Sequence, residues 1–100
     1  MKQIGTKGKN VQPEPFAVGF VLVNVAPTHE EEVHTKLSQV PEIQELYALF
    51  GEYDLIAKIE AKDFEKLGHI IVNELRCIEG VIDTRTLTAT KILVDRREKK

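Results

Sequence analysis

The sequence predicts an α+β fold in which four antiparallel strands form one sheet and two helices cover one of its faces. Apolar segments with strand and helix periodicity follow one another in the order strand-helix-strand-strand-helix-strand. A weak internal repeat with an offset of 38 residues, as expected of two copies of one β-α-β unit, matches Leu37, Val40 and Ile43 to Leu75, Ile78 and Val81. Two right-handed units of this kind form the ferredoxin-like βαββαβ sandwich.

The composition indicates one small domain. A chain of 100 residues suits a single domain. Its 14 Lys and Arg against 16 Asp and Glu give a net charge of −2, which argues against direct nucleic-acid or membrane-surface binding. The N-terminus leads into polar residues, and no apolar stretch is long enough to span a bilayer, so we expect a cytoplasmic protein.

The first strand is predicted to begin at residue 16. Residues 1–15 contain Gly, Pro and Lys with few apolar side chains, which is typical of a flexible N-terminal arm. Residues 16–25 are nearly continuously apolar and rich in β-branched side chains, so we expect a strand that is buried on both faces.

A helix is predicted between Thr28 and Pro41. Thr28 and Glu31 fit a capping box, in which Thr28 is the N-cap and the Glu31 side chain bonds back to it. Apolar residues then recur on one helix face at Val33, Leu37 and Val40. Pro41 ends the helix because it cannot continue the backbone hydrogen bonds.

Two strands and a second helix follow. Residues 43–50 and 53–61 are predicted strands joined at Gly51, whose backbone freedom suits a sharp hairpin. Asp63 is the expected N-cap of the second helix, and Gly80 lies just past its end. The predicted core stripe of this helix consists of Phe64, Leu67, Ile71, Leu75 and Ile78.

The last strand is predicted over residues 81–94, because β-branched threonines occupy every second position in its first part. The domain therefore extends from residue 16 to residue 94. Residues 95–100 form a polar C-terminal tail.

The segment between Leu49 and Ile56 combines several polar groups. Glu52, Tyr53 and Asp54 place two carboxylates, a phenol and backbone N–H groups in one small volume. A carboxylate can hold a ligand's ammonium group and free N–H groups its carboxylate, which would suit a free amino acid. The local sequence by itself favours the alternative that Asp54 only braces the turn through hydrogen bonds to the backbone.

The open face of the predicted sheet indicates self-association. Two helices cover one face, yet residues 16–25 and 43–50 carry apolar side chains on both parities. The exposed patch would reach roughly several hundred Å², which is large for a monomer. A twofold homodimer packed sheet to sheet, as in a dimeric α/β barrel, would bury it. The arm or the tail is the alternative cover, and the sequence leaves open whether dimers close into a ring.

Five stretches share a pattern with one known family: residues 21–25, 40–43, 50–55, 61–65 and 78–86. On these stretches, residues 16–93 resemble the effector-binding (RAM) domain of the Lrp/AsnC family of amino-acid-responsive transcription regulators. The Gly-x-Tyr-Asp turn from Gly51 to Asp54 and the Gly80-Val81 approach to the last strand are the most specific parts. Glu79 stands where the family usually has Pro.

The resemblance implies a binding site for a small effector, usually an amino acid, between subunits and beside the hairpin. Carried over by motif position, the site residues are Gly51, Glu52, Tyr53 and Asp54 in the turn, with Thr86 and Thr88 from the last strand. Ordinary strand filling is equally compatible with Thr86 and Thr88. Leu87, which lies between them, is expected to pack in the core.

The resemblance also implies an effector-binding and oligomerisation module. Family regulators carry a helix-turn-helix domain before this one, and the residues before the first strand are too few to form it. The sequence therefore predicts a stand-alone module that modulates transcription by assembling with itself or with full-length Lrp/AsnC regulators, without direct DNA binding.

Enzymatic and RNA-binding functions remain as alternatives. A small dimeric α/β-barrel enzyme of the monooxygenase or isomerase type would need a polar cavity with a histidine, and the predicted strands contain none. An RNA-binding sheet would need exposed aromatic side chains among basic ones. We expect no catalytic residue, metal or cofactor, since no phosphate loop, metal motif or nucleophile elbow is present. Cys77 is expected to be a packed core thiol.

Overall fold

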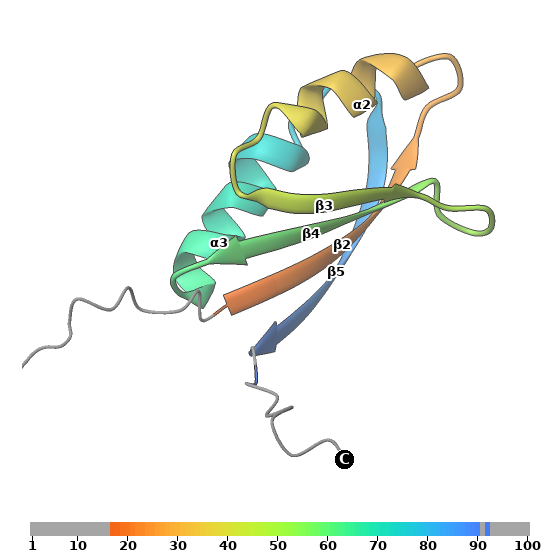
Figure 1. Cartoon of the computed structure of the whole chain (residues 1–100). Coiled ribbons are helices and arrows are strands. Elements are labelled where there is room, and N and C mark those ends of the chain that lie inside the picture. Colours follow the sequence, from red (N-terminus) through yellow and green to blue (C-terminus); the bar gives the residue numbers. More distant parts are fainter. Residues whose placement is uncertain (1–16, 91, 93–100) are drawn as a thin grey trace, which may run out of the picture.

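Four antiparallel strands form one sheet in the order β3-β4-β2-β5, and the helices pack against one of its faces (Figure 1). The computed structural model describes residues 17–90 and residue 92. The strands are β2 (Ala17–Val25), β3 (Ile43–Ala48), β4 (Leu55–Ala61) and β5 (Val81–Thr90). The helices are α2 (Glu30–Ser38), α3 (Phe64–Ile70) and the π-helical turn η1 (Ile71–Leu75). The predicted α+β class and βαββαβ order are confirmed.

The central strand β2 joins the two halves of the sheet. It pairs with β4 on one side and with β5 on the other, so that Val21 lies opposite both Ala57 and Thr86. The side chains on the helix side of β2, such as Val21 and Val23, are fully buried. On the other side, Val18 is buried but Phe20 and Leu22 are only half-buried, so the prediction of a strand buried on both faces holds fully for the helix side and only in part for the other.

The core lies between the sheet and the helices. Both copies of the predicted internal repeat contribute to it, because Leu37 and Leu75 are fully buried at equivalent positions. Ile43, Ile78 and Val81 pack against it while remaining partly exposed. The predicted N-terminal arm, the part of the last strand beyond Thr90 and the C-terminal tail lie outside the described residues, apart from residue 92.

The start of α2 differs from the prediction. Pro27 and Thr28 form the centre of a turn that is closed by a hydrogen bond of 3.0 Å from the His29 N–H to the Ala26 carbonyl. Thr28 has a φ of 71°, as the third residue of a type II turn requires. This conformation places Thr28 outside the helix, so His29 becomes the N-cap and no side chain caps α2. The predicted capping box is therefore wrong.

The second helix begins as predicted. Asp63 caps α3, because its Oδ1 accepts a hydrogen bond of 2.7 Å from the Lys66 N–H. After Ile70 the helix widens into η1, in which the Arg76 N–H bonds to the Ile71 carbonyl at 2.9 Å. This bond reaches back five residues, which is the π-helical spacing.

Helical structure ends at Leu75, and this early end changes the predicted apolar stripe. Leu67, Ile71 and Leu75 are buried as expected, whereas Phe64 at the start of α3 is 43% exposed. Cys77 falls in the following turn, where it is exposed and donates from Sγ to the Asn73 carbonyl at 2.8 Å. The prediction that Cys77 is a packed core thiol is wrong.

Gly80 and Gly51, the two glycines that the sequence analysis singled out, differ in backbone conformation and in how closely other atoms approach them. Gly80 has a φ of 102°, and an added Cβ would lie 2.8 Å from His29 Cβ and 2.9 Å from Val33 Cγ2. Gly51 has no positive φ, and an added Cβ there would meet nothing within 4 Å. The strands β3 and β4 are joined by a loop over residues 49–54, so the predicted sharp turn at Gly51 is also wrong.

We predict that Gly80→Ala lowers the free energy of unfolding by roughly 2 kcal/mol or more, because the new Cβ combines a strained φ with overlap against α2. Gly51→Ala is the matched control and is expected to change stability little. Urea unfolding of both variants measures the difference. Equal stability of the two variants would contradict the close approach of Gly80 to α2.

Candidate functional site

Asp54 ties the hairpin loop to the end of β2. Its Oδ2 accepts a hydrogen bond of 2.8 Å from the Val25 N–H. Its own N–H donates to the Val23 carbonyl at 2.9 Å, and its carbonyl accepts from the Leu49 N–H at 2.8 Å. Asp54 therefore braces the turn, as one of the two sequence interpretations expects. It is nevertheless exposed, so its carboxylate remains accessible to a ligand from outside the chain.

The other predicted loop residues lie beside Asp54. Gly51 and Glu52 are exposed and Tyr53 is half-buried. The loop projects beyond the end of the sheet (Figure 1). Phe50, which precedes these residues, is 99% exposed, an unusual state for a large apolar side chain. The loop thus exposes polar groups and one large apolar side chain, that of Phe50, to solvent.

Thr86 and Thr88 lie on the helix side of β5. They are paired with Val21 and Gly19, and directly opposed residues of antiparallel strands point to the same face. With α3 and η1 they line a depression of about 370 Å³, whose other residues are Phe64, Leu67, Gly68, Ile71 and Val72. Leu87 points to the opposite face and is 55% exposed, so the expectation that it packs in the core is wrong.

The loop and the threonines do not meet within one chain. Asp54 precedes β4, and β2 lies between β4 and β5. Leu55 lies opposite Val23, whereas Thr86 lies opposite Val21 and Thr88 opposite Gly19, further along the sheet. The structure therefore brings together the four loop residues and, separately, the two threonines.

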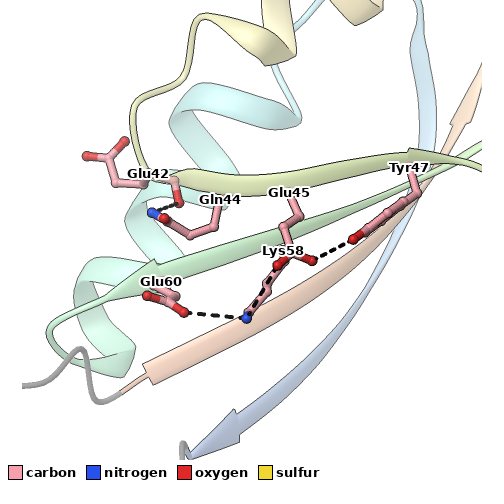
Figure 2. A network of polar contacts seen from close by, with 6 residues as sticks. All are labelled: Glu42, Gln44, Glu45, Tyr47, Lys58 and Glu60. Carbon is pink, nitrogen blue, oxygen red and sulfur yellow. Dashed lines mark hydrogen bonds and ion pairs between the residues drawn. The ribbon is translucent and has the colours of Figure 1, made fainter.

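The face of the sheet away from the helices carries a polar network that sequence reasoning missed (Figure 2). Lys58 Nζ lies 4.0 Å from Glu45 Oε2 and 3.6 Å from Glu60 Oε2. Tyr47 donates from its hydroxyl to Glu45 Oε1 at 2.9 Å. Beside it, Gln44 Nε2 donates to the backbone carbonyl of Glu42 at 3.3 Å. Glu45 and Lys58 come together only through the β3–β4 register, so no local signal in the sequence reveals the network.

Around this network the same face is apolar, as the sequence predicts. Phe20, Leu22 and Ile56 are half-buried, and Tyr47 and Leu87 are 56% and 55% exposed. We call this surface the open face. No described residue covers these side chains, so within residues 17–90 and 92 the patch stays in contact with solvent.

Among the described residues, no group of three or more His, Cys, Asp or Glu side chains is arranged to hold a metal ion. None of the helices in the described part of the chain has the length and apolarity to cross a membrane.

A family model described as the Lrp/AsnC ligand binding domain matches residues 18–99. The chain belongs to this family. FFRP-DM1, whose crystal structure has been solved, shares 36% sequence identity with this Lrp/AsnC domain. The two structures superpose with a TM-score of 0.70, and the match covers 73% of this chain and 97% of that one. A transcriptional regulator of Neisseria meningitidis, solved in complex with L-Met, shares the fold with a TM-score of 0.75 at 19% identity, covering 97% of this chain and 66% of that one.

Curated relatives of this Lrp/AsnC domain are longer proteins. The HTH-type transcriptional regulator FL11 of Pyrococcus furiosus is 35% identical over 85 residues, which are 82% of this chain and 56% of that protein. The chain spans about half the length of the curated regulators that it matches. It also matches homocitrate synthase of Sulfurisphaera tokodaii at 32% identity over 84% of this chain, but over only 19% of that enzyme.

We predict that Asp54→Ala lowers the free energy of unfolding by roughly 1–2 kcal/mol, because the Val25 N–H loses its acceptor. Asp54→Asn keeps an acceptor oxygen at this position and is expected to cost clearly less. Thermal unfolding of the two variants separates the hydrogen bond from the charge. An Asn variant as unstable as the Ala variant would show that the charge, and not the acceptor, carries the contribution.

A second prediction concerns the Tyr47 phenol. The hydrogen bond to Glu45, the nearby Glu45 charge and partial desolvation raise the pKa of Tyr47 above its ordinary 10.0. A raised pKa in the folded state stabilises the protein below pH 10, and this contribution disappears as pH rises through the folded-state pKa. We expect Glu45→Gln to lower the pKa of Tyr47. Absorbance titration of the phenolate, in a Tyr53→Phe background, measures it; an unchanged pKa would contradict the role of Glu45.

Proposed function

We propose that the chain is an amino-acid effector-binding and oligomerisation module whose binding site is completed by two subunits. The observation that carries the proposal is the separation of the loop carboxylates from Thr86 and Thr88 within one chain. Membership of the Lrp/AsnC ligand-binding family supports a small effector, and the L-Met complex of the Neisseria regulator supports an amino acid. The module acts by assembling with itself or with full-length Lrp/AsnC regulators, in the cytoplasm and without contacting DNA.

The proposed homodimer packs the open faces of two sheets against each other. At about 25 cal/mol per Å² of apolar surface, covering a patch of several hundred Å² stabilises a pair by several kcal/mol before association costs. This pairing gives a dimeric α/β barrel-like particle. Phe50 is 99% exposed on the hairpin loop, which projects beyond the end of the sheet (Figure 1), and suits contact with a neighbouring dimer in a ring.

Each site residue has a chemical part in the proposed complex. Glu52 and Asp54 on the loop of one subunit attract the ammonium group of the effector. The hydroxyls of Thr86 and Thr88 on a neighbour bond to its polar groups, while the apolar depression beside them receives its side chain. A ligand held by two subunits stabilises their assembly by RT ln(1 + [L]/Kd) per site, so effector binding and oligomeric state are coupled.

The enzyme alternative has a different requirement. A dimeric α/β-barrel enzyme needs a catalytic group inside the cavity that the sheet lines. The open face presents Glu45, Lys58 and Glu60, but these side chains are already paired with one another. The match to homocitrate synthase concerns a minor part of that enzyme, and the regulators match over about half their length. We therefore propose a regulatory and not a catalytic role.

We predict that one or a few of the twenty amino acids bind saturably, as measured by isothermal titration calorimetry with light scattering in parallel. Asp54→Asn, which keeps the turn acceptor but removes the charge, is expected to weaken binding at least about tenfold through the lost ammonium contact. Thr86→Val and Thr88→Val are expected to weaken it about three- to tenfold.

Thr84→Val is the matched control, because Thr84 lies on the same strand outside the depression that Thr86 and Thr88 line. Equal affinity of wild type, Asp54→Asn and Thr86→Val would contradict the proposed site. Absence of heat from every amino acid would overturn the amino-acid effector itself.

A further inference from the structure

Gly68 lines the depression between α3 and β5 and stands in the interior of a helix. Glycine there is less stable than alanine, because it loses more backbone freedom on folding. A positive φ or a close approach of other atoms would explain its presence. Gly68 has no positive φ, and an added Cβ would meet nothing within 4 Å. Gly19 on β2 differs, since an added Cβ there would lie 3.0 Å from Leu67 Cδ1. The packing of a single chain therefore does not require glycine at position 68.

The missing side chain leaves a gap in the helix wall of the depression. Phe64 and Val72 lie about one helical turn to either side of Gly68, and they are 43% and 52% exposed. The other residues that line the depression are two buried aliphatic residues and two threonines: Leu67, Ile71, Thr86 and Thr88. The space that a larger residue at position 68 would occupy is therefore bordered by apolar side chains on the helix and by hydroxyls on β5.

The lining of the depression favours an apolar occupant. None of its lining residues is charged, and the polar side chains among them are those of Thr86 and Thr88. Its volume of about 370 Å³ is in the range of small-ligand sites. An ionised or amide side chain placed there would lose hydration without gaining a partner for each polar atom. An aliphatic side chain loses no hydrogen bond and gains apolar contact with Phe64 and Val72.

We propose that Gly68 is a specificity-determining residue of the effector site, because its missing side chain leaves space for an aliphatic effector side chain of about leucine size. This inference rests on the two-subunit effector site proposed above, and it adds the class of the ligand and the residue that selects it. The effector side chain lies over Gly68, between Phe64 and Val72, while its ammonium group faces the loop carboxylates of the neighbouring subunit. A Cβ at position 68 therefore takes space from the effector side chain and leaves the contacts of its charged groups intact.

Gly68→Ala tests the inference, because its expected effects on stability and on binding have opposite signs. Alanine favours a helix over glycine, so we expect the thermal unfolding midpoint to rise by roughly 2–8 °C. In isothermal titration calorimetry of the full chain, free leucine is expected to bind the wild type roughly 50-fold more tightly than free alanine. Gly68→Ala is expected to weaken the binding of free leucine at least about tenfold and that of free alanine less than about twofold.

Glu65→Ala is the matched control. It places alanine in the same helix, at an exposed position that does not line the depression, so the affinity for free leucine is expected to stay unchanged. Light scattering of the ligand-free proteins tests the other occupant of the depression, a side chain of a second subunit. Wild type and Gly68→Ala are expected to have the same particle mass.

The outcomes separate this inference from the proposed function. Absence of binding by every amino acid would overturn the effector site and the role of Gly68 with it. Saturable binding that favours charged or amide side chains would overturn the aliphatic class alone. Binding of free leucine that Gly68→Ala leaves unchanged, or an equal loss of free leucine and free alanine, would overturn the role of Gly68. A lower particle mass of ligand-free Gly68→Ala would also overturn it, because the depression would then hold a side chain of a second subunit.

Discussion

The pairing of β2 with β4 and β5 is the constraint on which the rest of the structure depends. Because β2 is central, its side chains decide both faces of the sheet at once. Val21 and Val23 fill the core under the helices, and Phe20 and Leu22 form the middle of the open face. Apolar residues at both odd and even positions of β2 thus stabilise the core on one side of the sheet. On the other side they form an exposed apolar surface that a partner could bury.

Asp54 links this framework to the proposed effector site. Its carboxylate holds the end of β2 while remaining exposed on the projecting loop. A ligand ammonium that contacts Asp54 would therefore act on a group that is already oriented by the backbone, which lowers the entropy lost on binding. The same arrangement means that removing the side chain disturbs loop and ligand together, whereas changing its charge alone separates the two roles.

Each proposed binding surface of a single chain lacks some of the groups that a complete effector site needs. The loop residues lie apart from the threonines, and the depression beside β5 lacks charged groups. For each group that is missing at one of these surfaces, a group of the required kind lies elsewhere on the same chain. Assembly of identical subunits can therefore satisfy all of them, and an effector that bridges subunits shifts the assembly equilibrium through its binding energy.

The sequence by itself determined the order and type of the elements, because periodicity and turn residues act over a few positions. It located Asp63 as an N-cap, the buried stripe of Leu67, Ile71 and Leu75, and the apolar open face. The predicted capping box fails for a local reason, because the type II turn centred on Pro27 and Thr28 takes Thr28 out of the helix. Tertiary structure decided the exposure of Cys77 and Leu87, which depends on where η1 ends and on how β5 registers with β2. The Glu45–Lys58–Glu60 network and the separation of Asp54 from Thr86 arise only when distant segments pair, which no local pattern encodes.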